Sequence, residues 1–367
     1  LSYAVLALGD RQYANFCAFG HQLANWLGER GGRALFETIE VDNQDASALQ
    51  RWQAAVTALG PATADREGNG GIGAMEGFGA DAGTEPIPDV ASALVRPTFE
   101  PWRITVRERV NPAEPEHPLY RVVLTPGGDR RLPQWHAGDL ALVRHPDDPA
   151  HPREYSIASL PDDGGLELIV RQERHPDGTL GLCSGLLTEG CAVSDAHGEA
   201  DDADAMPADA STRLDVALRA NRNFRLDGNE RRPLILIGNG SGIAGLLALI
   251  RQARREGGRG HWLIFGERDP VHDRPAHALI EGWLADGTLA HADRVFSRGA
   301  SDREYVQHRL ASQQQRLREA IDADAAIYVC GSAVGMAGGV DQVLRDALGS
   351  DRVEALRDAG RYRRDVY

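Results

Sequence analysis

The chain has 367 residues, a formal net charge of −14 and no lysine, so every basic side chain except histidine is an arginine. This length gives room for two or three domains with a sizeable core. The acidic balance argues against a general role in binding nucleic acids or anionic membranes. It is compatible with docking to a basic protein partner, and equally with an ordinary soluble protein whose acidic surface has no specific partner.

The cysteines and the apolar stretches bear on metal binding, cellular location and membrane insertion. The four cysteines show no paired spacing typical of a metal site: Cys17, Cys183, Cys191 and Cys330. We expect a reducing, cytoplasmic location. The longest apolar stretch, residues 234–250, is interrupted by several glycines and therefore predicts a strand, a turn and a helix, not a membrane span. We expect a membrane contact only through a segment that precedes Leu1, and then on the cytoplasmic face.

Residues 1–59 alternate between apolar runs and helical patterns. They predict a strand at residues 3–8, a helix at 16–30, a strand at 35–41 and a helix at 46–59. This order is typical of part of an α/β domain, and we expect the chain to be a fragment of a longer protein.

Residues 60–97 are rich in Gly, Ala, Pro, Asp and Glu and have no hydrophobic period. This composition predicts a flexible linker, with an active-site lid as the alternative.

Residues 98–230 predict an antiparallel domain. Five short segments separated by Pro and Gly have the composition of strands, and together they suggest a small β-barrel: residues 102–110, 120–124, 139–143, 153–159 and 166–170. Residues 195–210 are acidic, rich in alanine and unpatterned, so we expect a solvated loop insertion there.

The fourth of these strands reads Arg153-Glu-Tyr-Ser-Ile-Ala-Ser159. Alternate residues of a strand share a face, so Arg153 and Tyr155 are expected on one surface. An arginine that clamps phosphate, a tyrosine that covers a ring and the hydroxyl of Ser156 would suit a flat ring with a phosphate tail. An ordinary barrel strand with a surface arginine is the alternative. Residues 181–184 open a short helix whose backbone N–H groups could hold a pyrophosphate.

Residues 231–367 follow an α/β pattern. Apolar segments at residues 233–237, 261–265, 294–296 and 326–329 alternate with helical patterns. This alternation predicts a parallel sheet with ligands at the carboxyl ends of its strands.

Two motifs in this region indicate a dinucleotide. Gly240-Ser-Gly-Ile-Ala-Gly245 matches G-x-G-x-x-G between a predicted strand and a predicted helix, which indicates a pyrophosphate site. Ser297 and Arg298 follow the third strand and could hold a ribose 2′-phosphate, with an ordinary loop arginine as the alternative. Three further polar residues lie close behind in the sequence: Arg303, Tyr305 and Gln307.

In their order and spacing, these motifs resemble the flavoprotein component of NADPH sulfite reductase and its relatives, the diflavin NADPH–haemoprotein reductases. The resemblance covers residues 1–59 and 99–367. It rests on the segments Leu8–Cys17, Arg153–Ser156, Gly181–Ser184, Asn223–Leu226, Ser297–Arg298, Tyr305–Gln307, Tyr328–Gly331 and Arg361–Tyr367. It implies the C-terminal part of a flavodoxin-like FMN domain, an FAD-binding β-barrel of the ferredoxin–NADP reductase type and an NADP-binding domain.

The resemblance also implies which residues bind the cofactors. FAD would be held by Arg153, Glu154, Tyr155, Ser156, Ile169, Val170, Arg171, Gly181, Leu182, Cys183 and Ser184. NADPH would be held by Gly238, Gly240, Ser241, Gly242, Ser297, Arg298, Arg303, Tyr305 and Gln307. FMN would bind only if the full protein contains the first half of its domain before Leu1. It would then be held by Leu8, Gly9, Asp10, Tyr13, Phe16 and Cys17, with Tyr13 covering the ring.

The same resemblance implies a hydride-transfer group of Ser156, Cys330 and Asp365. A buried structural cysteine is the alternative for Cys330. Tyr367, the last residue, would stack on the FAD ring, whereas the charged composition around it alone suggests a solvated tail.

The sequence departs from the family pattern at several points. The flavodoxin-like part would lack its first half, which we expect to precede Leu1 in a longer protein, and the connecting helical domain is missing between Trp102 and Arg153. Three substitutions fall near the nucleotide: Gly245 stands in place of Pro, Ser241 in place of Thr, and Gly339 in place of an acid.

We therefore expect an NADPH-dependent flavoprotein reductase that passes electrons from NADPH to FAD, to FMN and to a haem- or iron-containing acceptor protein. Two alternatives stay open. One is a ferredoxin- or flavodoxin-type NADP reductase that uses FAD alone, and the other is a flavin-binding docking module without turnover.

Overall fold

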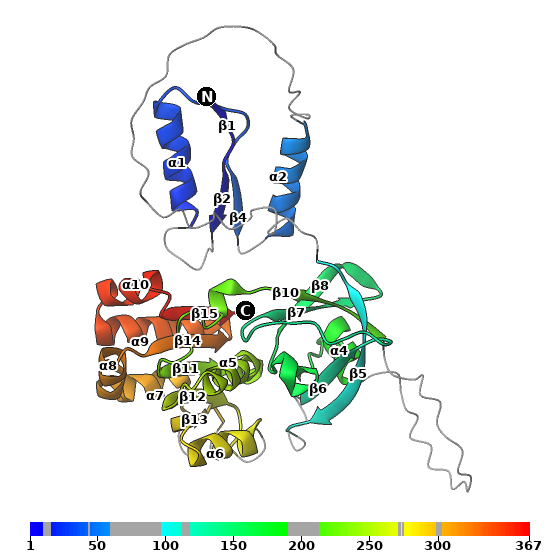
Figure 1. The fold of residues 1–367 in the computed structure, drawn as a ribbon, viewed down its shortest axis with the longest axis vertical. Helices are drawn as coiled ribbons and strands as arrows, with labels where there is room; N and C mark the ends of the chain where they lie inside the picture. The colour runs from blue at the N-terminus through cyan, green and yellow to red at the C-terminus, as the bar shows by residue number, and fades with distance from the viewer. Residues whose placement is uncertain are drawn as a thin grey trace, which may run out of the picture. The chain divides into compact units, whose positions relative to one another are not determined.

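The computed structural model describes residues 1–9, 16–42, 45–58, 97–111, 118–189, 213–270, 273, 275–298 and 303–367. The chain divides into two compact units, Leu1–Glu85 and Pro86–Tyr367 (Figure 1). Several predictions fall outside the described residues: the FMN-loop residues Asp10 and Tyr13, nearly all of the linker, and the acidic insertion at 195–210.

The first unit contains short parallel strands and two helices, as the sequence predicts. Its elements are β1 (Ser2–Tyr3), β2 (Leu6–Gly9), α1 (Ala18–Glu29), β3 (Arg33–Ala34), β4 (Ile39–Asp42) and α2 (Ala46–Ala58). The single strand expected at residues 3–8 is two short strands, because β1 pairs with β3 and β2 pairs with β4. Val5, Ala7 and Val41 form the buried interior between the helices.

The second unit begins with a six-stranded antiparallel sheet. Its strands are β5 (Glu100–Arg109), β6 (Leu119–Pro126), β7 (Leu140–His145), β8 (Asp148–Ser156), β9 (Leu166–Arg171) and β10 (Arg213–Arg219), in the order β8-β7-β10-β5-β6-β9. The short helix α4 (Leu182–Thr188) packs on it.

The antiparallel arrangement is confirmed, but no closed barrel is found among the residues that the structure describes. The two edge strands, β8 and β9, are bridged just beyond the end of β8. There Ile157 forms an isolated bridge with Leu168, and the Ala158 N–H donates to the Glu167 carbonyl at 2.8 Å.

The rest of the second unit is a five-stranded parallel sheet. Its strands are β11 (Leu234–Asn239), β12 (His261–Glu267), β13 (Leu289–Phe296), β14 (Ala326–Gly331) and β15 (Tyr362–Val366), in the order β13-β12-β11-β14-β15. Its helices are α5 (Ile243–Arg255), α6 (His277–Ala285), α7 (Val306–Ser312), α8 (Gln314–Asp322), α9 (Gly338–Leu348) and α10 (Ser350–Asp358). The predicted parallel sheet is confirmed, with β15 as an additional strand at its edge.

Alternation along the central strand explains the two cores of this domain. Leu234 and Leu236 pack with α5 on one face, and Ile235 and Ile237 pack with α7, α8, α9 and α10 on the other. Successive side chains of a strand point to opposite faces, so a strand buried on both sides is apolar throughout.

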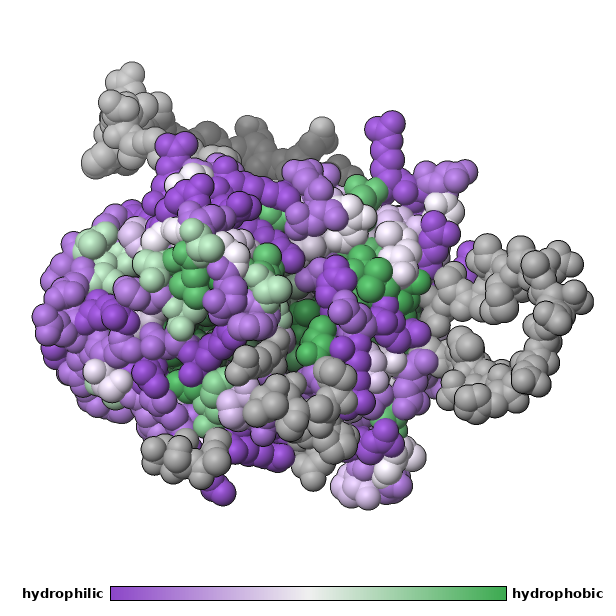
Figure 2. All heavy atoms as spheres, turned by 90° about the horizontal axis from the view of Figure 1, so that it is seen from below, coloured by the Kyte–Doolittle hydropathy of each residue, from purple (hydrophilic) through white to green (hydrophobic). Residues whose placement is uncertain are grey.

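Polar residues cover most of the face that Figure 2 shows, with smaller apolar areas between them. Within the described part of the chain, no helix combines the length and the apolar character needed to cross a membrane. The same residues contain no group of three or more His, Cys, Asp and Glu side chains that could hold a metal ion.

Candidate active site at the junction of the two sheets

The predicted hydride-transfer residues lie at the ends of three strands. Ser156 ends β8, Cys330 lies near the end of β14, and Asp365 lies on β15 directly opposite Cys330 in the parallel ladder. The Ser156 hydroxyl donates to Asp365 Oδ2 at 2.9 Å, and the Cys330 Sγ lies 3.8 Å from the same oxygen. The structure therefore brings together three residues from distant parts of the sequence.

Burial determines the protonation of this group. Cys330 is fully buried, and its burial, together with the nearby Asp365 carboxylate, raises the pKa of the thiol well above its usual value. Burial also raises the pKa of Asp365, against the opposing effect of the hydrogen bonds from Ser156 and Cys330. At neutral pH the Cys330 sulfur therefore carries a proton.

Gly245 allows helix α5 to approach this group closely. A Cβ at residue 245 would lie 3.2 Å from Cys330 Sγ and 3.6 Å from Ser156 Cβ. The preceding turn is equally tight, because a Cβ at Gly242 would lie 2.3 Å from the Cys330 carbonyl oxygen. The G-x-G-x-x-G motif thus packs its turn and helix against the end of β14.

Tyr367 is ordered beside the same turn. Its backbone N–H donates to the Gly331 carbonyl at 3.1 Å, and its hydroxyl lies 2.9 Å from the Ser241 hydroxyl. The alternative of a solvated tail is therefore wrong, because β15 and these bonds fix the last residues, while stacking of Tyr367 on a flavin stays a prediction. As a whole residue Tyr367 is exposed, whereas burial beside the nucleotide turn raises the pKa of its phenol.

The predicted FAD residues on β8 differ in how their side chains are engaged. Arg153 is exposed, and none of the carboxylates that the structure describes forms an ion pair with it. Tyr155 is partly buried, and its burial raises the pKa of the phenol, which stays neutral. Glu154 instead pairs with Arg219 through both carboxylate oxygens, so its side chain is already occupied.

Most side chains of the two other predicted FAD segments are buried or hydrogen-bonded, so mainly their backbone groups are left to contact a ligand. The Cys183 thiol donates to the Val143 carbonyl at 3.5 Å inside the core, and Val170 is also buried there. Ile169 is buried in the neighbouring core cluster. The Ser184 hydroxyl accepts from the Glu173 N–H at 3.1 Å, and Gly181 immediately precedes α4. Leu182 is the exposed side chain of this segment.

Arg171 ends β9 and reaches the nucleotide turn. A Cβ at Gly240 would lie 3.3 Å from Arg171 Nη2, and the same nitrogen lies 3.9 Å from Glu267 Oε2. Glu267 ends β12 and is buried, and this burial and the neighbouring Asp273 raise its pKa well above the usual value.

The predicted 2′-phosphate residues gather at the carboxyl edge of the parallel sheet. The backbone N–H groups of Ser297 and Arg298 donate to the carbonyls of Glu267 and Arg268, at 2.9 and 2.7 Å, which aligns the ends of β13 and β12. Exposed residues at the start of α7 follow, Arg303 and Tyr305, while Gln307 lies against Gly339.

The described part of the predicted FMN loop is tightly packed. A Cβ at Gly9 would lie 2.7 Å from the Cys17 nitrogen, and Cys17 has a left-handed φ of 53°. The Cys17 thiol donates to the Ala7 carbonyl at 3.1 Å in the interior, whereas Leu8 is largely exposed. Phe16 is partly buried beside Gly9.

One residue of this site has no signal in the sequence. Asn221 lies between β10 and the short turn Arg222–Phe224, and its Nδ2 lies 3.4 Å from Asp365 Oδ1. Nothing in its type or spacing distinguishes it from the polar residues around it.

The chain is similar to known flavoproteins along its whole length. Residues 1–54 match the flavodoxin family model. The whole chain aligns with the sulfite reductase [NADPH] flavoprotein alpha-component of Yersinia enterocolitica, at 24% identity over 465 positions and 76% of that protein. The alignment is longer than the chain, so the relative has segments that this chain lacks.

Two other alpha-components of the same name match more than half of the chain at higher identity. The protein of Mannheimia succiniciproducens is 31% identical over 60% of this chain, and that of Vibrio cholerae is 33% identical over 59%. These alignments span 36% and 35% of the two relatives, little more than a third of their length. The chain is therefore similar to the flavoprotein alpha-components of NADPH sulfite reductase, over its whole length at low identity and over little more than a third of the relatives at higher identity.

Proposed function

We propose that this chain is the electron-accepting part of an NADPH-dependent flavoprotein reductase. The observation that carries the proposal is the convergence of Ser156, Cys330 and Asp365 at the junction of an antiparallel and a parallel sheet, beside a dinucleotide-type turn. In this proposal, residues 98–230 are the FAD domain, with an incompletely closed barrel, and residues 231–367 are the NADP domain.

The residues present suit FAD. Arg153 is exposed without a described carboxylate partner, which fits a phosphate contact, and Tyr155 offers a neutral ring surface. The Ser156 hydroxyl and the Cys330 thiol border the position where a flavin and a nicotinamide would meet. FAD would supply the redox chemistry, by accepting a hydride from NADPH and releasing electrons singly.

The chain's own contribution is binding and proton control. Cys330 keeps its proton because it is buried, and Asp365 holds the Ser156 hydroxyl in a fixed direction. Gly245 leaves space for Cys330 and Ser156, and Tyr367, the last residue of the chain, can move aside for a nicotinamide. The side chains of Ser297, Arg298 and Arg303 would hold the 2′-phosphate.

The acceptor side of the proposal rests on the comparisons. The match of residues 1–54 to flavodoxins supports an FMN-binding domain, and the relatives' name supports a haem-containing sulfite reductase as the final partner. A reductase that uses FAD alone is the second candidate, because it would need only the site residues that follow residue 98 and no FMN domain.

The test is anaerobic addition of NADPH to the flavin-loaded chain. We expect stoichiometric bleaching of the flavin absorbance, much slower in Cys330→Ala and unchanged in Arg352→Ala, whose exposed side chain pairs with Asp322. Flavin that stays oxidised in the presence of excess NADPH would contradict the proposal and would mean that the chain is a flavin-binding docking module without turnover.

A further inference from the structure

The carboxylate of Asp365 is held from two sides. Ser156 donates to Oδ2 at 2.9 Å, whereas Asn221 Nδ2 lies 3.4 Å from the other oxygen, Oδ1. We propose that Asn221 is a positioning residue that fixes the orientation of the Asp365 carboxylate, so that Oδ2 faces Ser156 and Cys330. This inference rests on the proposed function and adds a residue to the same site.

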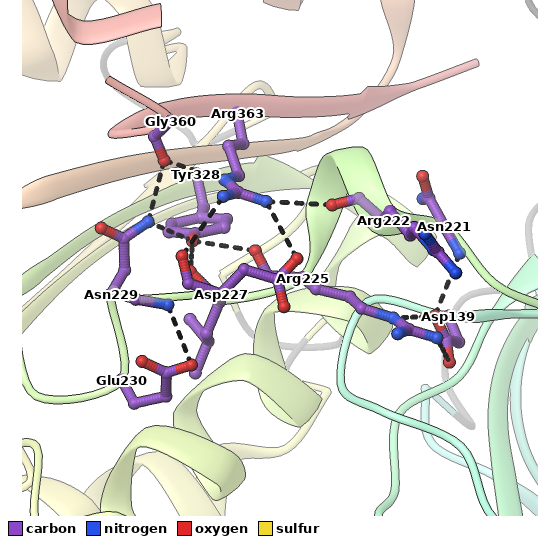
Figure 3. Close-up of polar contacts among 12 residues, drawn as sticks. Asp139, Asn221, Arg222, Arg225, Asp227, Asn229, Glu230, Tyr328, Gly360 and Arg363 are labelled. Atoms are coloured by element: carbon purple, nitrogen blue, oxygen red, sulfur yellow. Dashed lines mark hydrogen bonds and ion pairs between the residues drawn. The ribbon is translucent and has the colours of Figure 1, made fainter. Parts of the chain in front are cut away.

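Asn221 is itself anchored to the antiparallel sheet. Its backbone N–H donates to Asp139 Oδ1 at 3.0 Å, and Asp139 is buried just before β7. The Arg225 guanidinium donates to both oxygens of Asp139, at 2.7 and 2.8 Å, as Figure 3 shows. Because this charge-assisted pair is largely shielded from water, it holds Asp139 in place, and the backbone of Asn221 cannot shift without losing its own hydrogen bond to that carboxylate.

The same segment is also tied to the parallel sheet. The Tyr328 hydroxyl of β14 donates to the Arg225 carbonyl at 3.1 Å, and Asn229 Nδ2 donates to that hydroxyl at 2.9 Å (Figure 3). Arg363 of β15 donates to the Arg222 carbonyl at 2.9 Å. The distance between Asn221 and Asp365, which lies two residues after Arg363, is therefore fixed from both strands.

The orientation of the carboxylate has a chemical consequence. The terminal torsion of an Asp side chain is broad and two-fold, so an unheld carboxylate samples more than one orientation. A donor to Oδ1 also favours the charged form. The other groups that face Asp365 are Cys330 on β14, Glu154 on β8, Arg219 at the end of β10 and Tyr367 on its own strand. Loss of the amide donor should raise the pKa of Asp365.

The first test follows the carboxyl group directly. Asn221→Asp keeps the side-chain shape but places a carboxylate against Asp365, and Asn223→Asp makes the same change at an exposed position of the same segment. The probe is the side-chain carboxyl ¹³C signal of Asp365, assigned by its loss in Asp365→Asn. We expect its titration to move upward by roughly one pH unit or more in N221D and hardly at all in N223D. Equal titrations in the two variants would overturn the proposal.

The second test measures flavin reduction by NADPH in anaerobic stopped-flow experiments. N221D should slow reduction and shift its pH profile upward, with an NADPH dissociation constant within about twofold of the wild-type value, and N223D should match the wild type. The effects of Asn221→Ala and Asp365→Asn should not add, because the first acts through the second. Additive effects would show that Asn221 supports only the fold.

The two failures can be told apart. A wild-type chain that NADPH does not reduce would remove the proposed function, while the ¹³C titration would still decide the role of Asn221. If N221D does not fold, Asn221→Ser, which lacks the amide donor but adds no charge, replaces it in both measurements. A wild-type titration in N221S would then overturn the proposal.

Discussion

His261 begins β12 and is fully buried, although its ring is titratable. Its Nδ1 accepts a hydrogen bond from the Leu234 N–H at 3.1 Å, and burial lowers its pKa from 6.5 to about 4. The unfolded chain therefore takes up a proton at this position before the folded chain does. Stability is fully present above about pH 6.5 and is lost as the pH falls toward 4, by about 3 kcal/mol in total.

His261→Gln should remove this part of the pH dependence of unfolding. His291→Gln, at an exposed position of β13, serves as the matched control. Urea unfolding at pH 7.5 and pH 5 would give a smaller difference in unfolding free energy for H261Q than for the wild type or H291Q. A pH dependence in H261Q as large as that of the wild type would contradict the assignment.

Arg298 illustrates a residue whose role concerns specificity. Its backbone is fixed to the end of β12, and its side chain is exposed at the carboxyl edge of the sheet. A charge-assisted bond to a 2′-phosphate is worth roughly 1.5–3 kcal/mol. Arg298→Ala should therefore raise the Michaelis constant for NADPH about ten- to a hundredfold and leave that for NADH nearly unchanged. Steady-state kinetics with both nucleotides measure this, and equal losses would mean that Arg298 only supports the fold.

At the scale of elements, the packing of α5 on β14 leaves no space for a larger residue. The contact is made at Gly245, where a Cβ would press on Cys330 Sγ at 3.2 Å and on Phe224 Cε1 at 3.2 Å. Gly282 in α6 is the opposite case, because a Cβ there would meet no atom within 4 Å. The same substitution should therefore have opposite effects in the two helices.

We expect Gly282→Ala to stabilise the chain by about 0.5–1 kcal/mol, because alanine is the better helix former. Gly245→Ala should destabilise it, since overpacking of a core costs roughly 1–3 kcal/mol. Cys330→Ala removes the sulfur that the new methyl group would press against, so the G245A/C330A double variant should recover part of the loss. Urea unfolding compares the four proteins, and equal stabilities of G245A and G282A would disprove the packing argument.

The elements also show how much of the fold the sequence predicts. Apolar runs buried on both faces, such as those of β11 and β14, were predictable because their composition alone fits a central strand. β10 was not predicted, since it follows an unpatterned acidic stretch. β15, with the sequence Tyr-Arg-Arg-Asp-Val, is a strand only because β14 offers it a partner edge. Tertiary pairing decides such segments, and local composition cannot reveal it.

The site residues divide in the same way, into those that local motifs predict and those that depend on the tertiary structure. The turn at Gly240–Gly245 and the proposed 2′-phosphate residues, Ser297 and Arg298, were predicted from motifs that are local in the sequence. The meeting of Ser156 with Asp365, 209 residues apart, follows from the resemblance and not from spacing. Asn221 was missed because its role depends on where a turn places one amide group.

At the scale of the whole molecule, a buried polar junction joins the two sheets of the second unit. Asp139 lies just before β7 of the antiparallel sheet, and Arg225 lies in the segment that leads to the parallel sheet. The side chain of Asp139 is 4% exposed and that of Arg225 is 18% exposed. Removing one partner of a buried pair leaves the other charge uncompensated, at a cost of about 3–5 kcal/mol.

Arg225→Met should therefore destabilise the second unit by an amount of that order. Arg352→Met breaks the pair with Asp322, whose side chains are 44% and 64% exposed, and should cost less than about 1 kcal/mol. In urea, the wild-type unit should unfold in one transition, because the segment at Asn221–Asn229 is bonded to both sheets. R225M should separate this transition into two, with flavin released in the first, while R352M should keep one transition. A loss in R225M as small as that in R352M would mean that the junction is hydrated and that apolar packing alone holds the two sheets together.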